Sequence, residues 1–226
     1  MTPRVETVIT GLDGKPKGGN PFQNTGAWLD DRTGCLTASR IAIALQTKKD
    51  GKPTKAYWDL AKEILAERMT GEVMRRYVTP EMQRGTEREP DAREAYEVHT
   101  GNLVRLVGFI KHPTIEMCGA SPDGLVDDDG LVEFKCPTTT THLEYLMHGK
   151  VPDDYKPQMT LQLACTRRSW CDFVSFDDRL KTREHRLFVV RFEPSADEIA
   201  AIEATARAYL NLVDQMWEEL HTAKEQ

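Results

Sequence analysis

Residues 121–137 read SPDGLVDDDGLVEFKCP, and they predict a β-hairpin that carries both acidic and basic side chains. The apolar pairs on either side of the DDDG turn predict two strands of a tight hairpin. Residues two apart on a strand project from the same face, so Glu133 and Lys135 are directed to one spot while Phe134 points into apolar packing. The turn brings Asp123 back beside Glu133. The hairpin therefore predicts two carboxylates and one ammonium group close together.

These groups suit metal-assisted cleavage of a phosphodiester bond. Mg²⁺ prefers oxygen ligands, so Asp123, Glu133 and the backbone carbonyl of Phe134 are candidate ligands. The same oxygen atoms could also bind Mn²⁺. A bound divalent ion lowers the pKa of water and offsets charge developing on a phosphate. Lys135 is then a candidate for orienting or deprotonating the attacking water, provided that its surroundings lower its own pKa.

A simpler interpretation of the same residues is a surface hairpin with a cross-strand ion pair. The apolar neighbours of Glu133 and Lys135 argue against it, because a charged pair on a half-buried strand is costly without a role. Asp127, Asp128 and Asp129 are expected to be solvated turn residues. The segment also fails the calcium-loop pattern, since apolar residues stand where ligands are needed.

Composition narrows the class of protein further. The chain has 226 residues, of which 39% are hydrophobic and 29% charged, which excludes disordered and collagen-like chains. Its 30 basic and 36 acidic residues give a net charge of −6, so it is not a simple polycation. No apolar run is long enough for a membrane span, and no secretion signal is evident at the N-terminus. Five cysteines without a CxxC pair favour reduced thiols in a cytosol.

The remaining pattern predicts a mixed α/β domain with a central sheet flanked by helices. We expect one domain with an N-terminal arm (1–25), a core (26–194) and a long C-terminal helix (195–226). The apolar stripe of that last helix packs on the core or contacts another subunit. The predicted elements are helices over 37–46, 54–69, 80–99 and 157–166, strands over 103–110, 117–126, 131–136, 171–176 and 186–192, and the C-terminal helix, which begins at a capping box formed by Ser195 and Glu198. Thr37 is the expected N-cap of the first helix, and Pro90 predicts a kink or break in the third.

Four motifs in order make the chain similar to the phage lambda exonuclease family, also called YqaJ-like viral recombinases, of the PD-(D/E)xK nuclease superfamily. They are Trp28…Arg32…Leu36-Thr37-Ala38-Ser39, Gly85-x-x-x-Glu89, the SPDG and EFKCP segments quoted above, and Tyr155-x-x-Gln158. The resemblance implies a restriction-endonuclease-like core and a ring-shaped homotrimer around duplex DNA. It also implies 5′-to-3′ degradation of one strand of linear double-stranded DNA, which leaves a 3′ overhang. The expected partner is a phage-type single-strand annealing protein. The expected location of the chain is the cytoplasm of a bacterium or a phage-infected host.

The resemblance also assigns roles by motif. Asp123, Glu133 and the carbonyl of Phe134 would hold Mg²⁺, and Lys135 would activate the attacking water. Glu89 matches a glutamate that supports a second metal. The other matched residues are Gln158, which lines the catalytic pocket, and Arg32, Ser39 and Ser121, which hold the terminal 5′ phosphate. Without the resemblance, Arg32 would be expected to form a surface salt bridge with Asp30 or Asp31, and Trp28 would be expected to be a core residue.

Basic side chains outside this site are candidates for contact with the DNA backbone. Lys48 and Lys49 crowd one loop, and Arg75 and Arg76 form a second candidate. A solvated loop is the alternative for the lysines. Two other functions stay open at this point, namely a site-specific endonuclease on the same core and a catalytically silent DNA clamp.

Overall fold

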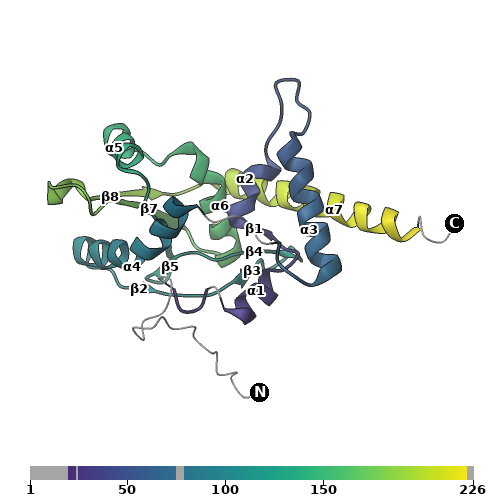
Figure 1. The fold of residues 1–226 in the computed structure, drawn as a ribbon, viewed down its shortest axis with the longest axis horizontal. Coiled ribbons are helices and arrows are strands. Elements are labelled where there is room, and N and C mark those ends of the chain that lie inside the picture. The colour runs from purple at the N-terminus through teal and green to yellow at the C-terminus, as the bar shows by residue number, and fades with distance from the viewer. Residues whose placement is uncertain (1–19, 24, 75–78, 223–226) are drawn as a thin grey trace, which may run out of the picture.

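The computed structural model describes residues 20–23, 25–74 and 79–222 (Figure 1). Its helices and strands are, in order, α1 Gly26–Arg32, β1 Leu36–Thr37, η1 Ala38–Arg40, α2 Ile41–Ala44, α3 Lys55–Thr70, α4 Pro80–Thr100, β2 Val104–Arg105, β3 Ile110–Lys111, β4 Cys118–Ala120, β5 Gly124–Val126, β6 Gly130–Lys135, α5 Thr139–His148, η2 Asp153–Tyr155, α6 Lys156–Thr166, β7 Trp170–Phe176, η3 Arg183–His185, β8 Leu187–Phe192 and α7 Ala196–Thr222. The predicted α/β class is confirmed, with helices on both faces of a mixed sheet and a long final helix.

The strands form two sheets rather than one. The larger has the order β2-β5-β6-β7-β8, in which β6 and β7 are parallel and the other pairs antiparallel. The smaller has the order β1-β4-β3, with β1 parallel to β4. Figure 1 shows the larger sheet beside α4 and α5, with α2, α3 and α7 grouped at the other end of the molecule.

The two faces of the larger sheet are buried by different helices. On one face Ala92 and Tyr96 of α4 pack against Val132, Phe134 and Val174. This packing holds α4, which also carries Glu89, firmly against the hairpin strands.

On the opposite face, α6 packs through Met159 and Leu163 against Leu131 and Phe173. Glu133 has the same parity as Leu131 on β6, so its side chain emerges on the α6 side. The predicted alternation of Glu133 and Phe134 is therefore confirmed.

Two of the predicted strands are wrong in extent. The expected strands 103–110 and 117–126 are each divided, with one part in each sheet. In the second case Pro122 explains the division, because proline cannot donate to a sheet ladder. The chain therefore leaves the small sheet after Ala120 and enters the large one at Gly124. The residues between them, which include Asp123, lie at the junction of the two sheets.

The predicted helix over 37–46 is also wrong in part. Leu36 and Thr37 pair in parallel with β4, and only η1 and the short α2 follow. Thr37 makes no side-chain cap and instead bonds to the hydroxyl of Ser39 at 3.1 Å. Pairing with a strand far along the chain outweighs the local helical pattern here.

Two of the described α-helices, α1 and α5, were not predicted. α1 begins at the cap Thr25, whose hydroxyl accepts from the N–H of Trp28, and α5 begins at Thr138 and ends at Gly149, which has a φ of 64°. The first turn of α5 is rich in threonine, which has low helix propensity, so the local signal was weak.

The longer helices follow the prediction. Just before α7 the N–H of Ser195 donates to Oε2 of Glu198, and the N–H of Glu198 donates to Oγ of Ser195, which confirms the capping box. Of the kink or break predicted at Pro90, the break does not occur, because α4 continues through Pro90 as one helix. Proline removes one helical hydrogen bond, but Ala92 and Tyr96 beyond it are fully buried against the sheet and keep the helix in place. Within the described residues, no helix is long and apolar enough to cross a membrane.

Candidate active site

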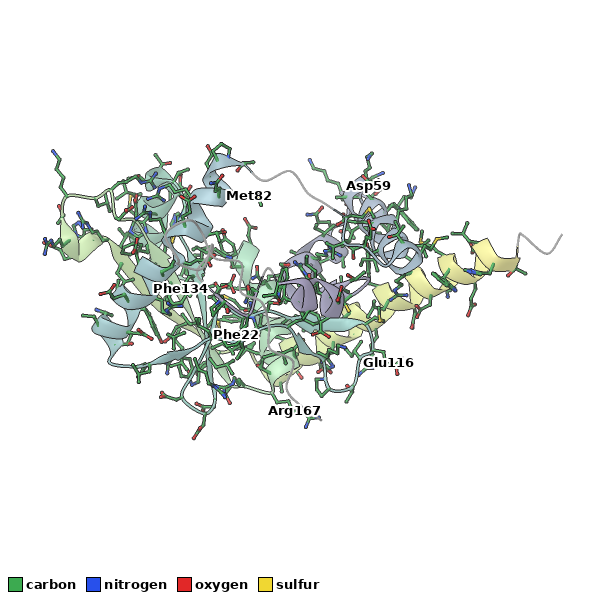
Figure 2. All side chains as sticks on the ribbon, turned by 60° about the horizontal axis from the view of Figure 1, so that its bottom comes forward. Phe22, Asp59, Met82, Glu116, Phe134 and Arg167 are labelled. Carbon is green, nitrogen blue, oxygen red and sulfur yellow. The ribbon has the colours of Figure 1, made fainter. Side chains whose placement is uncertain are left out.

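The β5–β6 hairpin brings Asp123 to the catalytic strand. Gly124 pairs with Val132, and one step further this register sets Asp123 opposite Glu133. The backbone N–H of Phe134 donates to Oδ2 of Asp123 at 2.7 Å. Figure 2 shows Phe134 among the side chains in the body of the molecule. Asp123 is thus fixed by the backbone of the strand that carries its partner.

Glu133 accepts hydrogen bonds from three side chains. Lys135 Nζ and Gln158 Nε2 donate to Oε1 at 2.5 and 2.6 Å, and Gln162 Nε2 donates to Oε2 at 2.7 Å. Only 2% of Glu133 is exposed, and these charged and amide donors offset the cost of burying its charge. Strand β6 and helix α6 together hold this carboxylate in one orientation.

A third carboxylate, Glu89, joins the pair from α4. Burial, then the charge of Glu133, raises the pKa of Glu89 to about 7. Burial, then the charges of Glu133 and Glu89, raises the pKa of Asp123 well above its usual range. The two groups also line a small depression with Asn20 and Arg93. Repulsion among carboxylates of this kind is what a bound cation relieves.

The chemistry of these donors fits Mg²⁺ or Mn²⁺, which take oxygen ligands. In the described part of the chain, however, no three His, Cys, Asp or Glu side chains converge into a group that could hold a metal ion. An ion bound by Asp123 and Glu133 would therefore complete its shell from a backbone carbonyl and water, as Mg²⁺ commonly does.

Lys135 is a charged donor in this arrangement. Burial by itself would lower its pKa, but the charges of Glu133 and Asp123 outweigh burial and hold the pKa of Lys135 above its usual range. Its Nζ lies 5.0 Å from the ring centre of Tyr155. Any cation that neutralised the two carboxylates would remove the cause of this rise and bring Lys135 closer to acting as a base.

Two of the three predicted phosphate-binding residues are joined through Trp28. The indole N–H of Trp28 donates to Oγ of Ser121 at 2.9 Å, and the Arg32 guanidinium stacks on the indole ring at 4.2 Å. Trp28 is thus a half-buried connector, not the simple core residue expected from the sequence alone. Ser39 is exposed, and its hydroxyl bonds to Thr37.

The predicted DNA-contact residues are placed only in part. Lys48 and Lys49 are exposed on the loop between α2 and α3, which is closed by a bridge between Thr47 and Pro53 and projects from the body in Figure 1. Arg75 and Arg76 lie outside the described residues.

Comparisons with known proteins were made on sequence and on structure. The YqaJ-like viral recombinase domain matches residues 27–169. The chain belongs to this family. It is 42% identical to the alkaline exonuclease LHK-Exo from Laribacter hongkongensis, with a TM-score of 0.82 over 89% of this chain and 98% of that one. LHK-Exo in complex with dAMP matches equally well, over 89% of this chain and 100% of the other.

A phage-related exonuclease from Haemophilus somnus 129PT shares the fold, with a TM-score of 0.62 at 16% identity over 82% of this chain and 96% of that one. The comparison with curated proteins gave no match. The family and its exonuclease relatives support a nuclease that hydrolyses DNA, which is the coarse activity that the motifs predicted.

Sequence reasoning missed two contributors to the site of this YqaJ-like nuclease. Gln162 bonds to Glu133, and its spacing of four from Gln158 on a helix was the signal that could have revealed it. Arg168 donates to the carbonyls of Val126, Asp127 and Gly130, which fixes the turn of the catalytic hairpin. No local pattern marks that contact.

Proposed function

We propose that the protein is a metal-dependent exonuclease that degrades one strand of linear double-stranded DNA from the 5′ end and leaves a 3′ overhang. The observation that carries the proposal is the convergence of Asp123, Glu133 and Lys135, with Glu89 beside them, at the junction of the two sheets. The similarity to an alkaline exonuclease supports the same reaction class.

The protein's own groups have distinct tasks in this proposal. Asp123, Glu133 and the carbonyl of Phe134 hold the divalent cation, with Glu89 supporting a second ion. When bound, such a cation lowers the pKa of water and offsets charge at phosphorus. Lys135, at the C-terminal end of β6, would orient the attacking water as an ammonium donor, and it would accept the proton of that water only where a bound cation has neutralised Glu133 and Asp123 and so lowered the pKa of Lys135. Gln158 lines the pocket and fixes Glu133.

Polarity would come from the pocket around Trp28. Arg32 offers a planar fork of donors to phosphate oxygens, and the hydroxyls of Ser39 and Ser121 add hydrogen bonds. A 5′ phosphate held there sets the distance to the next bond. Release of nucleoside monophosphates follows from cleavage one nucleotide at a time, and dAMP, with which the relative LHK-Exo was crystallised, is such a molecule.

Family resemblance supplies the rest of the proposal. We expect a homotrimer that encloses the duplex, with Lys48 and Lys49 contacting phosphates as the DNA enters. Arg75 and Arg76 are proposed as further backbone contacts. The new 3′ strand would pass to a phage-type single-strand annealing protein, and co-purification with such a protein encoded nearby would test that step.

One digestion experiment tests chemistry, polarity and metal need together. A linear duplex is labelled separately at each 5′ end and each 3′ end and is incubated with Mg²⁺, with Mn²⁺ and with EDTA. We expect early loss of the 5′ labels as mononucleotides, retention of the 3′ labels, and no reaction in EDTA. Loss of the 3′ labels first would overturn the polarity, and full activity in EDTA would overturn the metal requirement.

A covalently closed circular duplex is the matched control. It offers no end, so an exonuclease leaves it intact, whereas a site-specific endonuclease cuts it. A catalytically silent clamp would bind the linear duplex and release no nucleotide. The proposed function predicts degradation of the linear form alone.

A further inference from the structure

Gln162 lies on α6, one turn beyond Gln158, and is the more deeply buried of the two amides. Only 1% of it is exposed. Its Nε2 donates to Oε2 of Glu133, whereas Gln158 donates to Oε1 of the same carboxylate. Because residues four apart share a helix face, one helix provides an amide donor to each oxygen of Glu133.

The other end of the Gln162 amide carries a cost. Its Oε1 is buried and has no hydrogen-bond partner among the described residues. A buried acceptor without a partner is destabilising, and an apolar side chain of similar length would avoid that cost. Packing alone therefore gives no reason for an amide at this position, whereas the contact with Glu133 does.

Among the residues that the structure describes, the donors around Glu133 leave one acceptor position of its carboxylate open. An ionised carboxylate has about four acceptor positions, two on each oxygen. Lys135 and Gln158 take both positions on Oε1, and Gln162 takes one on Oε2. The remaining position is on Oε2, so the contact with Gln162 decides where the free lone pair of that oxygen points.

We propose that Gln162 is a positioning residue that turns Glu133 toward the divalent cation. This inference rests on the proposed function, which takes Glu133 as a ligand. Gln162 acts through Glu133 and not on the DNA. Groups that orient a metal ligand in this way typically matter about 10–100-fold for metal affinity or activity.

Two variants remove the hydrogen bond to Glu133 with opposite side effects. Gln162→Met keeps the length of the side chain and removes its polarity. Gln162→Asn keeps the amide but shortens the side chain by one methylene, so the amide no longer reaches Glu133 to form the 2.7 Å hydrogen bond. A loss that both variants share comes from the lost hydrogen bond. The control is Thr160→Val on the same helix, since Thr160 is buried and, within the described residues, its hydroxyl bonds only to the Lys156 carbonyl of α6.

The experiment measures binding of Mn²⁺ alone to the DNA-free protein, monitored through the spectroscopic signal of free Mn²⁺. The unfolding midpoint is measured for each variant as well. We expect both Gln162 variants to bind Mn²⁺ about 10–100-fold more weakly than the wild type and to degrade linear duplex more slowly, with Thr160→Val unchanged. Should Gln162→Met not fold, Gln162→Asn decides alone. Wild-type Mn²⁺ affinity in a folded Gln162 variant would overturn the inference. If the wild type itself neither binds Mn²⁺ nor degrades DNA, it is the proposed function that fails.

Discussion

The ammonium group of Lys135 is placed by the alternation of β6, 2.5 Å from Glu133. We predict that Lys135→Met lowers the rate of strand degradation by about 10²–10⁴-fold, the usual contribution of a group that moves a proton in the reaction. The loss of stability should be about 1–3 kcal/mol, because Glu133 keeps its two amide donors. Initial rates and urea unfolding measure the two effects. Lys156→Met is the control, since Lys156 pairs with the exposed Asp153. An unchanged rate in Lys135→Met would remove the proposed water activator.

Arg32 stacks on Trp28, whose indole also holds Ser121, so its charge lies over the pocket proposed for the 5′ phosphate. We predict that Arg32→Ala reduces the preference for 5′-phosphorylated over 5′-hydroxyl duplexes by about 10-fold or more, the scale of a lost charge-assisted hydrogen bond of 1.5–3 kcal/mol. The rate on short phosphorylated substrates should fall less than processivity. Arg207→Ala is the control, because Arg207 donates to Thr114 on the surface. Equal wild-type rates on both kinds of end would contradict the pocket.

The elements show where sequence reasoning succeeds and where it stops. Glu133 and Lys135 were predictable because side chains alternate on any strand, and Asp123 because a short turn fixes the register. The split of the strands around Pro122 was locally visible, since proline does not donate to a ladder. The parallel pairing of β6 with β7 was not, because it joins segments separated by α5 and α6 and depends on long-range packing.

Helix α3 is anchored to η1 by a buried ion pair that no motif indicated. Arg40 donates through both terminal nitrogens to Glu67 at 2.9 and 2.7 Å. Burial would raise the pKa of Glu67, but the hydrogen bonds and charge of Arg40, with the N–H groups of Gly34 and Met74, outweigh it and lower that pKa. This pair holds the segment that carries Ser39 against the helical core.

The lowered pKa of Glu67 makes this contribution to stability depend on pH. It is fully present above the unfolded-state pKa of about 4.3 and is lost as the pH falls through the lower folded-state pKa. We predict that Glu67→Gln costs about 3 kcal/mol at pH 7, the low end for breaking a buried pair, because Glu63 stays 3.3 Å from Arg40. The wild type should lose stability more steeply than the variant below about pH 4.3. Urea unfolding between pH 7 and pH 3 measures both, and parallel profiles would contradict the assignment.

For the whole molecule, the net charge of −6 makes the overall field unfavourable for DNA. Retention of a duplex over many cycles then requires enclosure or concentrated basic contacts, and the ring-shaped homotrimer expected from family resemblance provides enclosure. We predict a solution mass of three times the 25.6 kDa chain by light scattering, and long degradation runs in the presence of a competitor DNA trap. Dilution of the protein to concentrations at which the trimer dissociates should shorten the degradation runs, while cleavage of single nucleotides continues. A monomer that degrades DNA in runs of unchanged length would show that processivity comes from the contacts of a single chain. In that case, neutralising Lys48 and Lys49 should shorten the runs.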